Sequence, residues 1–142
     1  MGSVFSLRGM YDHAMAHYEE ALVTYREFFG DDHQGVPMVL GNMAIVYEKL
    51  GEEKEAIMRR REALAILRMQ IGDDHHVIMS SMLSIGTDLA KLGYLDESLY
   101  QLNEGLEIVL RVLGNHHLLS GEYLHTIGRV YRSQGDPPQP KT

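Results

Sequence analysis

The sequence predicts an all-α fold, a right-handed α-solenoid made from a short array of antiparallel helix pairs. The first observation is a repeat of 42 residues, a length typical of stacked helical units. The second is helical spacing inside each unit: Leu40, Met43, Ala44 and Tyr47 follow i, i+3, i+4, i+7, which is one face of an amphipathic helix. The positions that recur are Gly9, Gly51, Gly93 and Gly135; Gly30, Gly72 and Gly114; and His33, His75 and His117.

Glycines predict where the helices end. Gly30, Gly72 and Gly114 suit the position just past a helix C-terminus, and the Asp or Asn that follows each is expected to cap the next helix. Gly51 and Gly93 mark the tight turn within a pair. The expected helices are residues 12–29, 36–50, 53–71, 78–92, 95–113 and 120–134. Residues 1–8 align with the end of a further helix, which puts Gly9 in the column of the turn glycines.

Small residues recur where neighbouring helices are expected to touch. Because a small side chain lets two helix axes approach to roughly 8–10 Å, these columns predict the helix contacts. The columns are Ala44, Gly86 and Gly128; Ala14, Ala56 and Ser98; and Ala21, Ala63 and Gly105.

The segment Asn42–Gly51, followed by Ala56 and Ala63, resembles the tetratricopeptide repeat signature. Together with the 42-residue length, the linker Gly30–His33 resembles the subtype found in kinesin light chains and nephrocystin-3. The resemblance implies an array over residues 1–134, with a partial repeat at 1–29, full repeats at 34–71 and 76–113, and a half repeat at 118–134. The proline-rich residues 135–142 are expected to be disordered.

The resemblance also implies a function, that of a non-enzymatic scaffold binding a peptide or partner protein segment in a concave groove. The first helix of each pair would line this groove. The groove cations Lys49, Lys91, Arg129 and Arg132, together with Glu48 and Glu122, give the groove a local charge of +2 in a chain of net charge -7. We therefore expect an acidic partner. The alternative is that these cations only pair with Glu48 and Glu122. The expected groove residues are Asn42, Ile45, Lys49, Leu83, Ser84, Thr87, Lys91, His125, Thr126, Arg129 and Arg132.

Other function classes are disfavoured. The acidic balance argues against a nucleic-acid partner, and no apolar run is long enough to span a membrane. Without cysteine or a secretory pattern, we expect a cytoplasmic protein. Residues 1–6 match a short N-myristoylation pattern, and the alternative is that they belong to a truncated helix.

Histidines beside Asp and Asn in the linkers invite a metal-site hypothesis. Adjacent residues at a helix start point about 100° apart, which disfavours joint ligation. We therefore expect structural linkers, no metal, no cofactor and no catalytic activity. The alternative function is a self-associating structural module that stacks through its repeat ends. The face with Leu124, Ile127 and Tyr131 would then form a homodimer contact.

Overall fold

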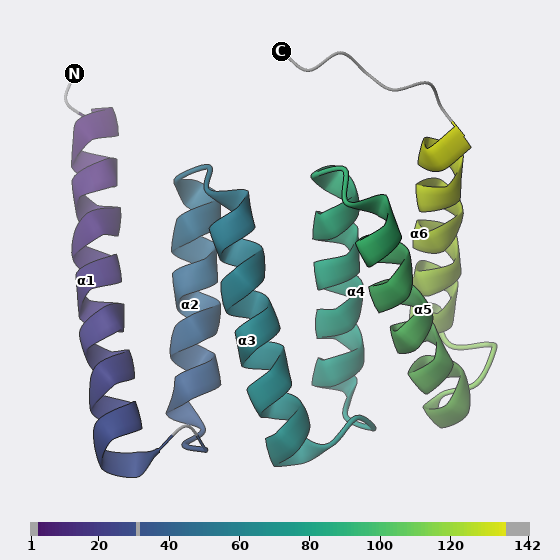
Figure 1. Ribbon diagram of the computed structural model, residues 1–142, viewed down its shortest axis with the longest axis horizontal. Coiled ribbons are helices and arrows are strands. Elements are labelled where there is room, and N and C mark those ends of the chain that lie inside the picture. The colour runs from purple at the N-terminus through teal and green to yellow at the C-terminus, as the bar shows by residue number, and fades with distance from the viewer. Residues whose placement is uncertain (1–2, 31, 136–142) are drawn as a thin grey trace. The chain divides into compact units, whose positions relative to one another are not determined.

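The computed structural model describes residues 3–30 and 32–135, and in these residues it contains six helices and no strand (Figure 1). The all-α prediction is therefore confirmed. The chain divides into two compact units, residues 1–72 and 73–142, and each is described by itself. The first two residues of the myristoylation pattern and residues 136–142 of the predicted tail lie outside the described residues.

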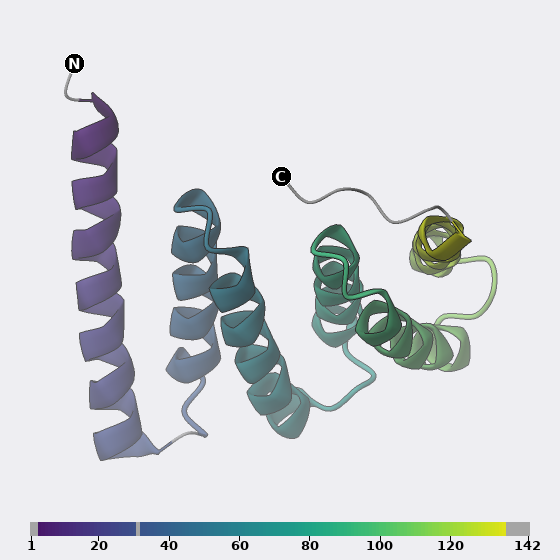
Figure 2. The ribbon, with the colours of Figure 1, turned by 45° about the horizontal axis from the view of Figure 1, so that its top comes forward.

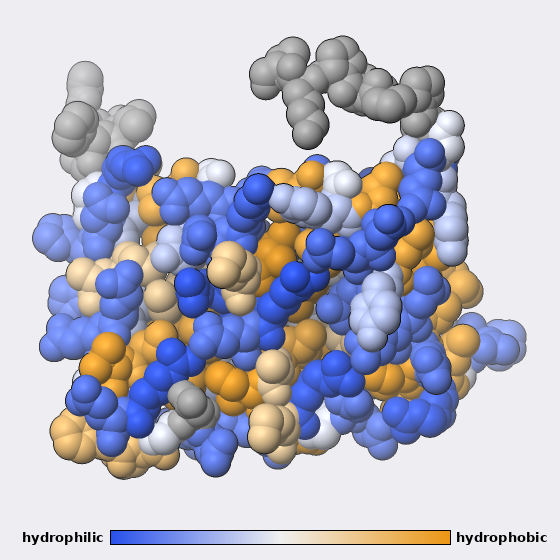
Figure 3. All heavy atoms as spheres, in the orientation of Figure 1, coloured by the Kyte–Doolittle hydropathy of each residue, from blue (hydrophilic) through white to orange (hydrophobic). Residues whose placement is uncertain are grey.

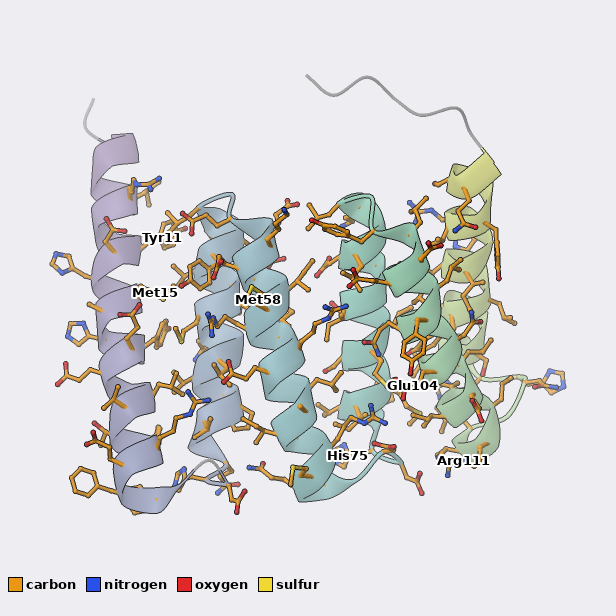
Figure 4. All side chains as sticks on the ribbon, in the orientation of Figure 1. Tyr11, Met15, Met58, His75, Glu104 and Arg111 are labelled. Carbon is orange, nitrogen blue, oxygen red and sulfur yellow. The ribbon has the colours of Figure 1, made fainter. Side chains whose placement is uncertain are left out.

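The first unit contains α1 (Ser3–Phe29), α2 (Gly35–Lys49) and α3 (Glu53–Ile71), and successive helices run antiparallel (Figure 1). Its core is formed mainly by α2. Val36, Leu40 and Met43 are almost fully buried there and pack with Ala63 of α3. From α1, Met15 packs against this cluster (Figure 4). Apolar residues at helical spacing thus bind α1 and α3 to opposite sides of α2.

The second unit contains α4 (His76–Lys91), α5 (Leu95–Val112) and α6 (Leu118–Gly135). The helix α5 packs on both others, and α6 also contacts α4. Figure 2 shows α6 almost along its axis, beside α5. A buried hydroxyl joins the first two helices, because Ser98 Oγ donates to the carbonyl oxygen of Gly86 at 2.6 Å.

The tight turns within both helix pairs have the same hydrogen bonds. Gly93 N–H donates to Ala90 O at 3.0 Å, and Tyr94 N–H reaches back to Leu89 O at 3.0 Å. These two bonds define a Schellman motif, which needs a positive φ at its glycine. Gly93 has φ of 89°, and Gly51 in the first unit has φ of 78°. The predicted turns are confirmed at both glycines.

Gly9 shares the column of these turn glycines but lies inside α1, which runs unbroken from Ser3 to Phe29. The prediction of a separate helix before Gly9 is wrong. Gly9 does not take the positive φ of the turn glycines, so α1 continues through it. Continuing the helix keeps its backbone hydrogen bonds, and an internal glycine costs only about 1 kcal/mol.

The remaining helix ends agree with the predicted glycines. Gly30, Gly72 and Gly114 have φ of 81°, 81° and 83°. Gly72 has ψ of 167°, so it is in the mirror-image extended region and not in the left-handed helical region common at helix C-termini. The last described helix ends at Gly135, one residue further than predicted.

Candidate groove on the second unit

A depression of about 180 Å³ lies between α4 and α6. Both helices are the first of their pairs. Its lining residues are Thr87, Ala90 and Lys91 from α4, with Thr126, Arg129, Val130, Arg132 and Ser133 from α6. Five of the predicted groove residues are therefore brought together by the structure.

The depression is basic, although the unit around it is acidic. Residues 73–135 contain eight Asp and Glu against four Lys and Arg. Three of those four cations, Lys91, Arg129 and Arg132, line the depression, and none of the eight acids does. The fourth, Arg111, donates to Asp74 at 3.1 Å (Figure 4). Positive charge is thus concentrated at one place on the unit.

Acidic residues of the groove helices do not neutralise these cations within the described residues. Glu48 on α2 forms its ion pair with Arg60, which belongs to α3. No ion pair joins Lys91, Arg129 or Arg132 to a described acidic residue.

Both threonine hydroxyls in the depression donate their protons to backbone carbonyl groups of their own helices. Thr87 Oγ1 donates to Leu83 O at 2.8 Å, and Thr126 Oγ1 donates to Glu122 O at 2.8 Å. Since each hydroxyl has one proton, both are left with acceptor lone pairs only. They suit an incoming N–H group, whereas the nearby cations suit an incoming carboxylate.

The other predicted groove residues lie elsewhere. His125 and Ser84 are exposed and Leu83 is half-buried, and none of the three lines the depression. Asn42, Ile45 and Lys49 lie on α2 in the first unit, where Ile45 is 49% exposed. Sequence reasoning missed Val130, which forms the apolar floor at 3% exposure. Its position four residues after Thr126 on the same helix was the available signal.

The helix α6 is held in place by Tyr123. This side chain is fully buried, and its hydroxyl donates to Met79 O of α4 at 2.5 Å. Burial raises the pKa of Tyr123 above its usual range. The nearby Glu104 carboxylate also raises this pKa, and a backbone hydrogen bond at Leu83 lowers it. The phenol therefore stays protonated and keeps donating, which fixes the distance between the two groove helices.

The linker histidines cap the helices that follow them. Nδ1 of His33 accepts from Gly35 N–H at 2.9 Å, and Nδ1 of His117 accepts from Leu119 N–H at 3.0 Å. His75 does the same toward Val77 at 3.3 Å (Figure 4). At α4 the N-cap is therefore His75 and not the predicted Asp73 or Asp74, and Asp31 lies outside the described residues. Nδ1 of a histidine is the same number of bonds from Cα as Oδ1 of an asparagine, so a histidine can cap a helix in the same way. The described residues contain no group of three His, Cys, Asp or Glu side chains suited to a metal.

The repeated sequence that forms these helix pairs and turns matches a known sequence profile. The profile of the tetratricopeptide repeat (TPR) family matches residues 1–69 and 77–139. The chain belongs to the tetratricopeptide repeat family. The predicted resemblance is thereby confirmed over nearly the whole sequence. No curated protein sequence matches the chain.

Solved structures of TPR proteins have the same fold. The chain superposes on BtubC (BKLC) from P. vanneervenii with a TM-score of 0.70 at 22% identity, covering 90% of this chain and 51% of that one. It also superposes on nearly identical TPR-like repeats assigned to a kinesin light chain of Podosopora anserina, with a TM-score of 0.76 at 18% identity. That match covers 92% of this chain and 62% of the other. The TPR chain thus spans about half to three-fifths of these structures.

TPR proteins generally mediate protein–protein interactions, and the family is typically non-enzymatic. Among the helices that the structure describes, none combines the length and hydrophobicity needed to cross a membrane.

Proposed function

We propose that this TPR chain is a non-enzymatic scaffold that binds an acidic segment of a partner protein between α4 and α6. The observation that supports the proposal is the set of three cations, Lys91, Arg129 and Arg132, around a depression without an acidic residue. Like charges placed together on an acidic protein attract an oppositely charged segment and orient it. A basic nucleic-acid face is disfavoured by the net charge of -7.

A bound peptide would use two kinds of contact. Carboxylates of the peptide would accept hydrogen bonds from Arg129 and Arg132, since a guanidinium presents two parallel donors. Peptide N–H groups would donate to the hydroxyl oxygens of Thr87 and Thr126, whose own protons are already engaged. Val130 would contact an apolar side chain. Further contacts are proposed at Leu83, Ser84 and His125 of the same unit. Asn42, Ile45 and Lys49 of α2 stay proposed groove residues of the first unit by itself.

The size of the depression supports a peptide and not a small-molecule substrate. Its volume of about 180 Å³ is below the ~300–1,000 Å³ of sites that enclose drug-sized ligands. Such a volume takes one or two side chains of a longer segment.

The proposal includes a cytoplasmic location, which the absence of cysteine favours.

The test is a binding measurement with labelled peptides of one composition but different charge. Fluorescence anisotropy should show tighter binding of peptides rich in Asp and Glu than of their Lys-substituted versions. Arg129→Glu should weaken an acidic hit by roughly tenfold or more, about 1.4 kcal/mol. Arg8→Glu is the matched control, because it makes the same charge change on α1, outside the depression, and should leave binding nearly unchanged. Preference for basic peptides would reject the proposal.

Self-association is a second candidate function. Leu124 and Tyr131 on α6 are each 55% exposed, although Leu40, Met82 and Leu89 in the same columns are buried. Exposed apolar faces of this kind favour contacts with another molecule. Sedimentation velocity over a range of concentrations tests this candidate, which requires that the average mass rise with concentration.

A further inference from the structure

Three cationic side chains border the depression between α4 and α6 from both of its walls. Arg129 and Arg132 lie three residues apart on α6, so they share one side of that helix with Cβ atoms about 5–6 Å apart. Lys91 lies on α4, in the same repeat column as Ser133 of α6 and one position beyond the column of Arg132. The positive charges therefore surround one small space. Figure 3 shows hydrophilic residues, in blue, at the C-terminal end of α6.

These charges are available to a ligand. All three side chains are exposed, and none forms an ion pair with a described acidic residue. Ser133 also lines the depression, and its hydroxyl makes no hydrogen bond in the described part of the chain. Its proton can therefore be donated to an acceptor of the ligand. The depression thus offers three cations and one hydroxyl donor at the same place.

The charge and size of the depression together favour one class of anion. A single carboxylate has one negative charge and two oxygens, so it compensates one of the three cations. A phosphorylated side chain has a charge of about -1.5 to -2 at pH 7 and three acceptor oxygens, one for each cation. Two carboxylates would supply the same charge only by ordering two side chains, which costs additional conformational entropy. The volume of about 180 Å³ has room for one phosphorylated side chain.

We propose that the acidic segment bound by this TPR chain carries a phosphorylated serine or threonine, whose phosphate lies between Lys91, Arg129 and Arg132. The inference rests on the proposed function and names the group that the depression recognises. Each arginine would donate parallel N–H groups to phosphate oxygens. The ammonium of Lys91 and the hydroxyl of Ser133 would donate to the lone pairs that remain.

The threonines favour a peptide as the carrier of the phosphate. The hydroxyl protons of Thr87 and Thr126 are donated to backbone carbonyl groups, so these oxygens can only accept. Backbone N–H groups beside the phosphorylated residue would supply the missing donors. An extended anionic surface, such as a phospholipid membrane or a nucleic acid, would be repelled by the net charge of -7, whereas a short segment meets only the basic depression.

The experiment compares labelled peptides that share one acidic sequence and differ only at a central position, which is Ser, Glu or phosphoserine. A further peptide has two adjacent Glu residues there and so matches the charge of the phosphate. Fluorescence anisotropy with the full chain should show the phosphoserine peptide bound about tenfold more tightly than either Glu peptide, because one phosphate reaches all three cations.

Three variants locate the phosphate. Lys91→Gln, Arg129→Gln and Arg132→Gln each remove one cation at an exposed position, so thermal melting should be unchanged. Each should reduce the preference for phosphoserine over Glu by about threefold or more. Arg111→Gln is the matched control, since it removes the remaining cation of residues 73–135 outside the depression and should leave the preference intact.

The outcomes separate this inference from the proposed function. If the Glu and phosphoserine peptides bind equally well and Arg129→Gln weakens both, the acidic-segment function stands and phosphate recognition is overturned. If none of the acidic peptides binds the wild type, both are rejected. A preference for phosphoserine that survives all three variants would place the phosphate outside the depression and overturn the inference. Displacement of the peptide by inorganic phosphate or by phosphoinositide vesicles at equal phosphate concentration would also overturn it, because the segment would then contribute nothing.

Discussion

Gly105 on α5 lies beneath the aromatic ring of Tyr123 on α6, so a β-carbon at Gly105 would come within 2.6 Å of the ring carbons Cε1 and Cζ. The ring cannot move aside easily, because its hydroxyl is bonded to Met79 O. We expect Gly105→Ala to lower the free energy of unfolding by about 1–3 kcal/mol through overpacking. The control is Gly128→Ala, which meets no atom and should raise it by about 0.5–1 kcal/mol. Urea unfolding of both variants provides the measurement.

Replacing Ala56 or Ala63 by Leu should cost about 1–3 kcal/mol, because both alanines are buried between helices. The same substitution at exposed Glu53 should be nearly neutral. Ala14→Leu is a closer control, since Ala14 shares the column of Ala56 but is half-exposed. Thermal melts that rank Glu53→Leu as the most damaging change would show that the helix phase is wrong.

The histidine caps can be tested by a pair of substitutions at His117. Removing the acceptor in His117→Ala should destabilise the start of α6 by about 1 kcal/mol. In His117→Asn the side-chain oxygen can take the place of Nδ1 and accept from Leu119 N–H, so most of the stability should be retained. Equal loss in the two variants would argue against capping as the role of this residue.

Alkaline pH should reveal the buried phenol of Tyr123. Its pKa is raised in the folded state, whereas the unfolded phenol titrates near its usual value of about 10. Above that pH the folded state therefore binds more protons than the unfolded state, and stability must fall as pH rises. This fall should be steeper in the wild type than in Tyr123→Phe, by up to about 1.4 kcal/mol per pH unit. Denaturant unfolding near pH 8 and above about pH 10 tests the sign.

Binding of an acidic peptide should weaken with salt, because exposed charges are screened over about 8–10 Å at physiological ionic strength. The double variant Lys91→Glu, Arg129→Glu should bind such a peptide weakly and lose most of the salt dependence. Titrations at low and high salt measure both effects. Binding that stays unchanged in the double variant would place the peptide elsewhere on the chain.

The helix pairs, the turns at Gly51 and Gly93 and most of the small-residue columns could be predicted from the sequence, although Gly9 and Gly128 do not behave as their columns predict. These features depend on local preferences, such as glycine at positive φ in Gly51 and Gly93, and on the 3.6-residue period of apolar residues. The family resemblance added the groove residues, and of these Thr87, Lys91, Thr126, Arg129 and Arg132 do line one depression.

Other features depend on packing between helices, and local sequence patterns do not determine them. Gly9 lies in the same repeat column as the turn glycines Gly51 and Gly93, yet it lies inside α1 and stays helical. The capping role of His117 depends on a side-chain direction that no spacing specifies. Val130 became a groove residue only because α6 approaches α4 there, at a distance set by Tyr123 and Gly105. Contacts between helices are fixed by shape and burial, and a one-dimensional repeat does not contain these.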